Sequence, residues 1–317
     1  MMEHKKPRVL GIVGATASGK TALSLDVVDA LNGEIVCLDS MQIYRRMDIG
    51  TAKPTPQERA RTPHHMLDIV EPTQPFSVAE YVELAHRVIA DILARGHVPV
   101  LVGGTGLYLQ GLSLPMDYGG LPSDLSLRAQ LQEELAQIGP EALHERLRQI
   151  DPESAERLHP NDTRRVIRAL EIHALTGIPM SARKTPTAAD APFDFQLFAP
   201  DWPRAELHAR INLRVDQMMA EGLLDEVTTL LHEGVPADAQ SMQGLGYKEL
   251  IPVLQGDTSL ADAVERIKTG TRNYARRQLI WFRRDKRIRW LPSDQLKSAK
   301  DKIISIWEDP ASWISNT

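Results

Sequence analysis

The sequence GATASGKT at residues 14–21 matches the pattern G-x-x-x-x-G-K-[ST]. An apolar run at 8–14 predicts a strand before it, and residues 19–31 predict a helix after it. In such a strand–loop–helix, the backbone N–H groups and the helix N-terminus form a nest for a diphosphate; the lysine adds charge and the threonine hydroxyl can ligate Mg²⁺. The motif does not say which phosphate compound is bound. We expect the diphosphate to contact Gly14, Ala15, Thr16, Ala17, Ser18, Gly19, Lys20 and Thr21, and the metal to contact Thr21.

Short apolar strands alternate with amphipathic helices through the first hundred residues. Two further strands are predicted at 34–38 and 98–102, and a helix is predicted over 77–96. A polar loop with several prolines, from about 40 to 75, separates the second strand from that helix. This order is typical of a parallel sheet with helices on both faces. We therefore predict an α/β fold with a three-layer core like that of the P-loop NTPases.

The pattern changes after Leu114. Residues 123–176 place Leu, Ile and Ala at helical spacing with many charges between them, and no strand is indicated there. Residues 181–192, rich in proline and small side chains, predict a linker, and 193–199 predict a strand that returns to the sheet. We expect a helical insertion domain at 117–192 and a core formed by 1–116 and 193–317.

The last third of the chain is predicted to be mostly helical and carries a basic stretch. Helices are expected at 204–234, with a break near Gly222 left open, around Tyr247 and at 259–284, before a last strand at 287–291. Although the net charge of the protein is −5, residues 264–290 hold ten Lys or Arg against two acids. A local charge of this sign and density favours a nucleic-acid partner.

Composition places the chain among ordinary globular proteins. Its 317 residues are 42% hydrophobic and 25% charged, and the apolar runs are too short to cross a membrane. A single cysteine, Cys37, cannot form an internal disulfide, and its place in a predicted buried strand favours packing. We expect a soluble, cytoplasmic protein, a monomer with no membrane partner.

Asp39 is a carboxylate at a position where a catalytic residue is expected. Asp39 follows the second strand, and the carboxyl ends of parallel strands are where ligands bind in such sheets. The third strand ends in GGTGLY at 103–108, where a kinase or NTPase would be expected to hold its metal with a carboxylate, and a GTPase-type N-K-x-D is absent. Asp39 is therefore a candidate for the chemistry, although it would also serve as a cap of the following loop.

Several blocks together resemble the tRNA dimethylallyltransferase, or isopentenyl transferase, family. They lie in family order between about Gly11 and Arg284 and read GATASGKT, DSMQIYRRMDIGTAK, HHMLDI, GGTGLY, RRVIRALEI, GYKEL and YARRQLIWFRR. The resemblance implies that the P-loop grips the diphosphate of dimethylallyl diphosphate rather than of ATP, with Mg²⁺ as cofactor. It further implies that the acceptor is the N6 amine of the adenine immediately 3′ of the tRNA anticodon.

The resemblance also assigns roles to residues. Asp39 matches the general base, Thr105 lines the channel where the substrates meet, and Arg214 or its neighbour Arg210 holds the diphosphate. The chemistry requires such groups, because an adenine amine is a poor nucleophile that must lose a proton. The departing diphosphate must be neutralised, which a lysine, Mg²⁺ and a forked arginine can do.

The same resemblance nominates contacts to the tRNA anticodon stem-loop. The chain departs from the usual pattern at three of these positions: it has Arg164 in place of Gln, Gly244 in place of Cys and Lys248 in place of Arg. Base-specific contacts by Arg164 and Gln243 are therefore left open. The nominated residues are Asp39, Ser40, Met41, Gln42, Arg164, Arg165, Val166, Ile167, Arg168, Gln243, Gly244, Leu245, Gly246, Tyr247, Lys248, Arg276, Arg277 and Gln278.

Other functions compete with this interpretation. Transfer to AMP, ADP or ATP is the nearest alternative, but a mononucleotide does not need so long a basic surface. A small-molecule kinase would release ADP from ATP, and an RNA-binding P-loop module would leave tRNA unmodified. His64, His65 and Asp68 could suggest a metal site, but they lie in a block of the resemblance that is not a zinc motif.

Overall fold

The computed structural model describes residues 6–114, 124–182 and 191–309. It contains two compact units, one formed by Met1–Ser113 with Ala191–Thr317 and the other by Leu114–Asp190. The segment 117–123 and most of the linker expected at 181–192 fall outside the described residues.

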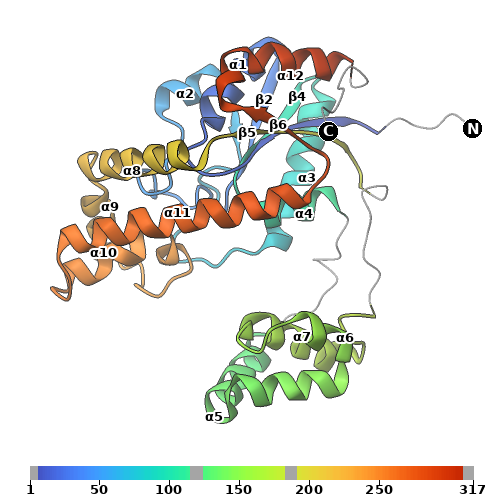
Figure 1. Ribbon diagram of the computed structural model, residues 1–317, viewed down its shortest axis with the longest axis vertical. Coiled ribbons are helices and arrows are strands. Elements are labelled where there is room, and N and C mark those ends of the chain that lie inside the picture. Colours follow the sequence, from blue (N-terminus) through green and yellow to red (C-terminus); the bar gives the residue numbers. More distant parts are fainter. Residues whose placement is uncertain (1–5, 115–123, 183–190, 310–317) are drawn as a thin grey trace, which may run out of the picture. The chain divides into compact units, whose positions relative to one another are not determined.

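The larger unit contains a six-stranded sheet in which every pairing is parallel (Figure 1). The strand order is β3-β2-β4-β1-β5-β6, so that the strand leading into the P-loop is central. The strands are β1 (Arg8–Val13), β2 (Gly33–Leu38), β3 (His64–His65), β4 (Val98–Gly103), β5 (Asp194–Asp201) and β6 (Ile288–Pro292). The predicted α/β fold with a P-loop and a parallel sheet is thus confirmed.

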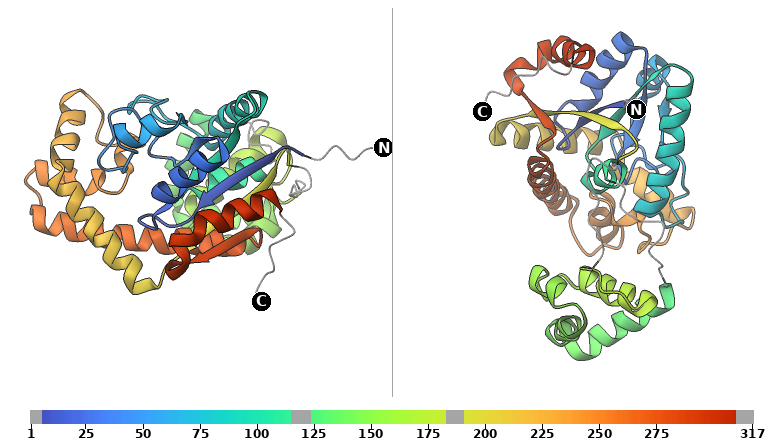
Figure 2. Two further views of the ribbon diagram at one scale, coloured as in Figure 1. Left: turned by 90° about the horizontal axis from the view of Figure 1, so that it is seen from above. Right: turned by 90° about the vertical axis from the view of Figure 1, so that its right-hand side faces the viewer.

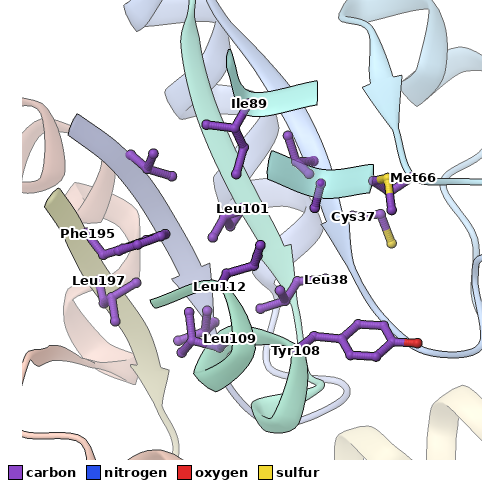
Figure 3. Close-up of a cluster of buried hydrophobic side chains, with 14 of the residues drawn as sticks. Cys37, Leu38, Met66, Ile89, Leu101, Tyr108, Leu109, Leu112, Phe195 and Leu197 are labelled. Atoms are coloured by element: carbon purple, nitrogen blue, oxygen red, sulfur yellow. The ribbon is translucent and has the colours of Figure 1, made fainter. Parts of the chain in front are cut away.

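Helices cover both faces of this sheet, because the strands are apolar on both sides. On one face, Tyr81 of α3 stacks on Tyr108 of α4 with ring centroids 3.8 Å apart, and donates from its hydroxyl to the carbonyl of Cys37 (2.7 Å). Figure 3 shows this cluster, where Leu109 and Leu112 of α4 lie over the strands. The helices are α3 (Val78–Ala94), α4 (Gly106–Ser113) and the C-terminal end of α11 (Leu260–Arg284) on that face, and α1 (Lys20–Leu31) and α12 (Ala299–Glu308) on the other.

The segment after β2 lies beside the helices that follow β5 (Figure 2), and a second hydrophobic core joins them. Glu226 connects the two: its carboxylate accepts from the backbone N–H groups of residues 48, 49 and 50 and from the hydroxyl of Tyr247 (2.6 Å). A side chain on Gly50 would meet the ring of Tyr247 at 2.5 Å, so this close approach requires glycine. The helices are α8 (Arg204–Ala220), α9 (Leu223–His232) and α10 (Tyr247–Leu254), with the short α2 (Pro56–Arg61) in the loop.

The smaller unit is helical throughout its described residues. Its helices are α5 (Leu125–Ile150), α6 (Pro152–Arg157) and α7 (Thr163–Thr176). Gly139, with φ 81°, and Pro140 interrupt α5. Leu143, Leu147 and Leu170 are among the residues that form the core. The unit has its own hydrophobic core and no strand among residues 124–182.

Sequence reasoning missed the strand β3 and the helices α2, α4 and α12. The stretch expected as a loop at 40–75 contains β3 and α2, and α12 follows the strand expected to be last. The break near Gly222, left open within the helix expected at 204–234, is confirmed, because Gly222 adopts φ 98° between α8 and α9. Within the described ranges, no helix has the length and apolar character needed to cross a membrane.

Candidate active site

Three loops converge at one edge of the sheet because the strands before them are paired in register. Gly103 of β4 lies opposite Val13 of β1 and Leu38 of β2. The residues that follow these strands therefore leave the same edge: the P-loop after β1, Asp39 after β2 and Gly104-Thr105 after β4. The amide N–H of Thr105 donates to the carbonyl of Leu38 (3.1 Å) and closes the junction between the second and third loops.

The P-loop has the backbone shape of an anion nest. Gly14, Ala17 and Gly19 have φ of 131°, 60° and 88°, and the last of these precedes the first turn of α1. Such left-handed positions turn successive N–H groups inward, where a diphosphate would accept from them. The Lys20 ammonium donates to the Ala15 carbonyl (2.6 Å), so it already lies across the loop.

Lys20 is electrostatically tuned. Burial, together with the nearby cation of Arg214, lowers the pKa of its ammonium to about 7, and Asp39 opposes the change. An anion bound in the nest would add a negative charge beside the ammonium and raise that pKa again. Lys20 is therefore expected to take up a proton when a diphosphate binds.

Asp39 is held by its own loop and faces the cations of the nest. Its Oδ1 accepts from the amides of Met41 (2.8 Å) and Gln42 (3.4 Å), while Oδ2 makes no hydrogen bond with any described residue. Burial raises the pKa of the Asp39 carboxyl; the two amides, Lys20 and Arg214 oppose that change. A carboxylate with a raised pKa and one free oxygen is suited to accepting a proton. The loop-cap role and the role as a base are compatible, because they use different oxygens.

Thr105 bonds to the Asp39 segment directly. Its hydroxyl oxygen accepts from the amide of Ser40 (3.0 Å) and lies 3.4 Å from the Ser40 hydroxyl. A third side chain, Tyr274 of α11, is close enough to Thr105 and to Asp39 for both to affect its pKa, which burial raises. Sequence reasoning did not select Tyr274 for this site, because it lies far along the chain in the basic stretch.

Arg210 and Arg214, one helical turn apart on α8, border the P-loop. Arg210 donates to the Ala17 carbonyl (2.8 Å) and lies over the ring of Trp202, 4.2 Å from its centroid. Arg214 donates to the hydroxyl of Thr16 (3.4 Å), and its cation is attracted by Asp39. With Lys20, these arginines line a cavity of about 330 Å³ beside residues 17–22.

A larger cavity of about 1080 Å³ adjoins the first, and four residues line both cavities: Thr21, Glu58, Arg214 and Gln217. Lys53 borders it and fixes the surrounding loop: its buried ammonium donates to the Tyr44 carbonyl (2.6 Å), to Asp48 (2.7 Å) and to Asp68 (2.5 Å). In the residues that the structure describes, no group of three or more His, Cys, Asp or Glu is arranged to hold a metal.

The structure brings two of the segments nominated for tRNA together. Met41, beside Asp39, packs against Gly244, where a side chain would meet its Cε at 2.5 Å. The glycine in place of the family's usual cysteine therefore gives room to the end of Met41. Gln42 does not point outward, because its amide donates to the carbonyls of Thr51 and Ala52 (both 3.0 Å).

Of the remaining nominated residues, some are exposed, some are buried, and Ser40, Arg168 and Leu245 are partly buried. Arg276, Arg277, Gln243, Lys248 and, in the smaller unit, Arg164 and Arg165 are exposed. Val166 and Ile167 lie in the core of the smaller unit, Tyr247 is bonded to Glu226, and Gln278 is buried. A direct RNA contact by these four side chains conflicts with that burial, so their place in the motif blocks reflects packing and internal hydrogen bonds.

Comparison with known proteins places the chain in a family. Residues 42–285 match the model of the IPP transferase family, and residues 7–73 match that of isopentenyl transferases. The chain is 50% identical over 289 residues to the tRNA dimethylallyltransferase of Pelotomaculum thermopropionicum (91% of this chain, 92% of the relative). It is 47% identical over 300 residues to that of Geobacillus thermodenitrificans (95% of each).

Solved structures support the same family assignment. The tRNA isopentenylpyrophosphate transferase of Bacillus halodurans superposes with a TM-score of 0.72 at 40% identity and covers 97% of this chain and 98% of its own. A eukaryotic dimethylallyltransferase acting on tRNA gives a TM-score of 0.82 at 30% identity, over 96% and 80% of the two chains. The resemblance drawn from the motif blocks is confirmed, and the chain belongs to the IPP transferase family.

Proposed function

We propose that this protein transfers a dimethylallyl group from dimethylallyl diphosphate to the N6 amine of the adenine immediately 3′ of the anticodon in tRNA, releasing diphosphate. One observation supports this assignment above the others. Asp39, a carboxylate whose pKa is raised by burial, lies within electrostatic range of Lys20 and Arg214 at the P-loop. A general base and a diphosphate-binding loop at the same edge of the sheet suit a reaction that removes a proton and releases diphosphate.

In the proposed reaction, the amine nitrogen forms a bond to the allylic carbon as the bond from that carbon to the diphosphate oxygen breaks. The amine proton passes to the free Oδ2 of Asp39, which removes positive charge from the transition state. Lys20, Arg214 and Arg210 neutralise the negative charge that develops on the departing diphosphate. The Thr105 hydroxyl accepts a hydrogen bond from the Ser40 amide and so fixes the loop next to Asp39, the proposed general base.

Mg²⁺ fits the donor side of this site. Thr21 lines both cavities at the first turn of α1, next to the lysine that would contact the diphosphate, and a hydroxyl oxygen is a ligand that Mg²⁺ accepts. When bound there, Mg²⁺ would add positive charge to the leaving group. We propose Thr21 as its protein ligand.

The exposed cations suit RNA phosphates. Arg276 and Arg277 of α11, and Arg164 and Arg165 of α7, are solvent-exposed and can neutralise phosphates without desolvating a buried charge. A base inside an anticodon loop must leave its stack before its amine can reach a carboxylate at a sheet edge. We propose that these arginines hold the RNA backbone while the adenine reaches Asp39.

Incubation with unmodified tRNA, dimethylallyl diphosphate and Mg²⁺, followed by mass analysis of the nucleosides, tests the proposal. We expect adenosine to gain the mass of one dimethylallyl group at a single position, and AMP in the same mixture to stay unmodified. Modification of AMP at a comparable rate would identify an adenylate prenyltransferase instead. Conversion of added ATP to ADP, with the RNA unchanged, would identify a kinase or an NTPase.

A further inference from the structure

Gln278 on α11 is a buried amide whose two ends are both used within the protein. Its Oε1 accepts from the backbone N–H of Thr16 in the P-loop (2.9 Å), and its Nε2 donates to the carbonyl of Gly104 (2.9 Å). The orientation of the amide is fixed by its partners, because one can only donate and the other can only accept. Only 6% of this residue is exposed.

The backbone before and after Thr105 is shaped to receive α11. A side chain on Gly104 would meet Nε2 of Gln278 at 2.1 Å, and one on Gly106 would meet the ring of Trp281 at 2.3 Å. Two residues of one helix therefore approach the backbone on either side of Thr105. The position of Thr105 relative to the P-loop depends on this approach.

Both hydrogen-bond partners of the Gln278 amide, Thr16 and Gly104, lead to residues of the proposed reaction site. Thr16, whose backbone N–H donates to Gln278, accepts from Arg214 at its hydroxyl, on the side of the departing diphosphate. Gly104 precedes Thr105, which accepts from the Ser40 amide next to Asp39 on the side of the acceptor. The Gln278 amide thus connects the P-loop, which is proposed to hold the diphosphate, to the loop of Thr105, which contacts the segment of Asp39.

We infer that Gln278 is a positioning residue that holds the P-loop and the Thr105 loop at a fixed separation, through the bridge from Thr16 to Gly104. The inference rests on the proposed function, since it concerns the distance between donor and acceptor. Its neighbours Arg276 and Arg277 are exposed on the same helix, so the helix proposed to hold the tRNA backbone also sets this separation. Misplacing reacting groups by about 1 Å can cost roughly 100-fold in rate.

Substitution by methionine, Gln278→Met, retains the side-chain length and removes both hydrogen bonds. At saturating tRNA and dimethylallyl diphosphate, we expect the single-turnover transfer rate to fall about 10- to 100-fold, while both dissociation constants stay within about threefold. Gln278→Asn retains an amide but is too short to reach both partners, and the same loss is expected. Gln295→Met is the matched control, because Gln295 is exposed in the turn at 293–298.

Unfolding temperatures and circular dichroism of all three variants accompany the rates. A purely structural role predicts a lowered unfolding temperature with a normal rate at low temperature, and that result would overturn the inference. So would equal losses in donor and tRNA affinity without a change in rate, or failure of both Gln278 variants to fold. Absence of transfer by the unaltered protein would instead refute the proposed function.

Discussion

The P-loop edge of the sheet and the helical insertion both present arginines, but they hold them differently. Arg210 and Arg214 are tied to the P-loop backbone and to Thr16, close to Lys20. Arg164 and Arg165 are exposed on α7, and Arg165 makes a surface ion pair with Asp162 (3.1 Å). Cations held at the P-loop can stabilise a leaving group at a defined place, whereas exposed surface cations attract an RNA backbone. Substitutions at the edge should therefore change rates, and substitutions in the insertion should change affinity.

The largest effect is expected at Asp39. Asp39→Asn retains the bonds from the Met41 and Gln42 amides but cannot accept the amine proton, so the single-turnover rate should fall by roughly 10² to 10⁴. Affinity for tRNA should stay nearly normal. Because burial raises the pKa of this carboxyl, the rate of the unaltered protein should fall as the pH drops through that raised pKa. The variant should lose this dependence.

Measurement across Mg²⁺ concentrations separates this role from metal binding. If Asp39 held Mg²⁺, the defect would shrink as Mg²⁺ is raised and would appear in donor binding. If it only capped the loop, the variant would run within about threefold of the normal rate, since asparagine caps as well as aspartate.

Loss of Lys20 should have the next largest effect. Lys20→Ala should lower kcat/KM for the donor by roughly 10² to 10³, the range for loss of one preorganised donor. The free ammonium has its pKa lowered to about 7 and a bound diphosphate raises it, so donor binding at pH 8 should take up a proton. Donor affinity should accordingly fall as the pH rises above about 7.

Calorimetry in two buffers of different ionisation enthalpy measures that proton directly. Lys20→Arg is the matched control, because arginine stays protonated and should take up none. Equal binding enthalpies in both buffers for the unaltered protein would show that Lys20 is already charged, or does not contact the donor.

A smaller effect is expected from the exposed arginines. Replacing Arg164 and Arg165 together by alanine should weaken tRNA binding and flatten its log–log dependence on salt by about 0.7 to 0.9 for each phosphate that is no longer neutralised. The rate at saturating tRNA should stay normal. Arg276→Ala with Arg277→Ala should act in the same way. If the salt dependence of tRNA binding were unchanged in both double variants, these exposed arginines would not be the groups that neutralise RNA phosphates.

The smallest effect on function is expected at Glu34, far from the site. Hydrogen bonds from Arg95, helped by His65 and opposed by burial, lower the pKa of the Glu34 carboxyl to about 2. Because an unfolded glutamate titrates near 4.3, this stabilisation is present above about pH 4 and is lost as the pH falls towards 2. Glu34→Gln should cost about 1.5 to 3 kcal/mol at pH 7, and less below pH 4, with an unchanged transfer rate. Urea unfolding at several pH values checks the sign.

Sequence patterns were sufficient to predict those elements that are set by a local run of residues. The runs around Val13, Leu38 and Val102 predict strands, and parallel pairing then brings the residues after them to one edge. This logic is enough to place Lys20, Asp39 and Thr105 together. The two residues of β3 are too few to show an alternation, and α12 is a ten-residue helix beyond the basic stretch.

Contacts between distant residues could not be predicted in this way. Gln278 stands among arginines in a block that resembles an RNA-binding segment, and nothing in its neighbours indicates that its partners are Thr16 and Gly104. Val166 and Ile167 were likewise grouped with the arginines around them, although helical spacing puts them on the buried face of α7. The motif identifies the segment, whereas the fold decides which side chains in it remain exposed.

The central claim is that the P-loop holds a departing diphosphate while the neighbouring carboxylate takes a proton from tRNA. The most direct test counts diphosphate release and prenylated adenosine in the same reaction, with ATP also present. We predict equal amounts of the two products, no ADP, and no diphosphate release when tRNA is omitted. Hydrolysis of ATP, or diphosphate release without modified adenosine, would contradict the account.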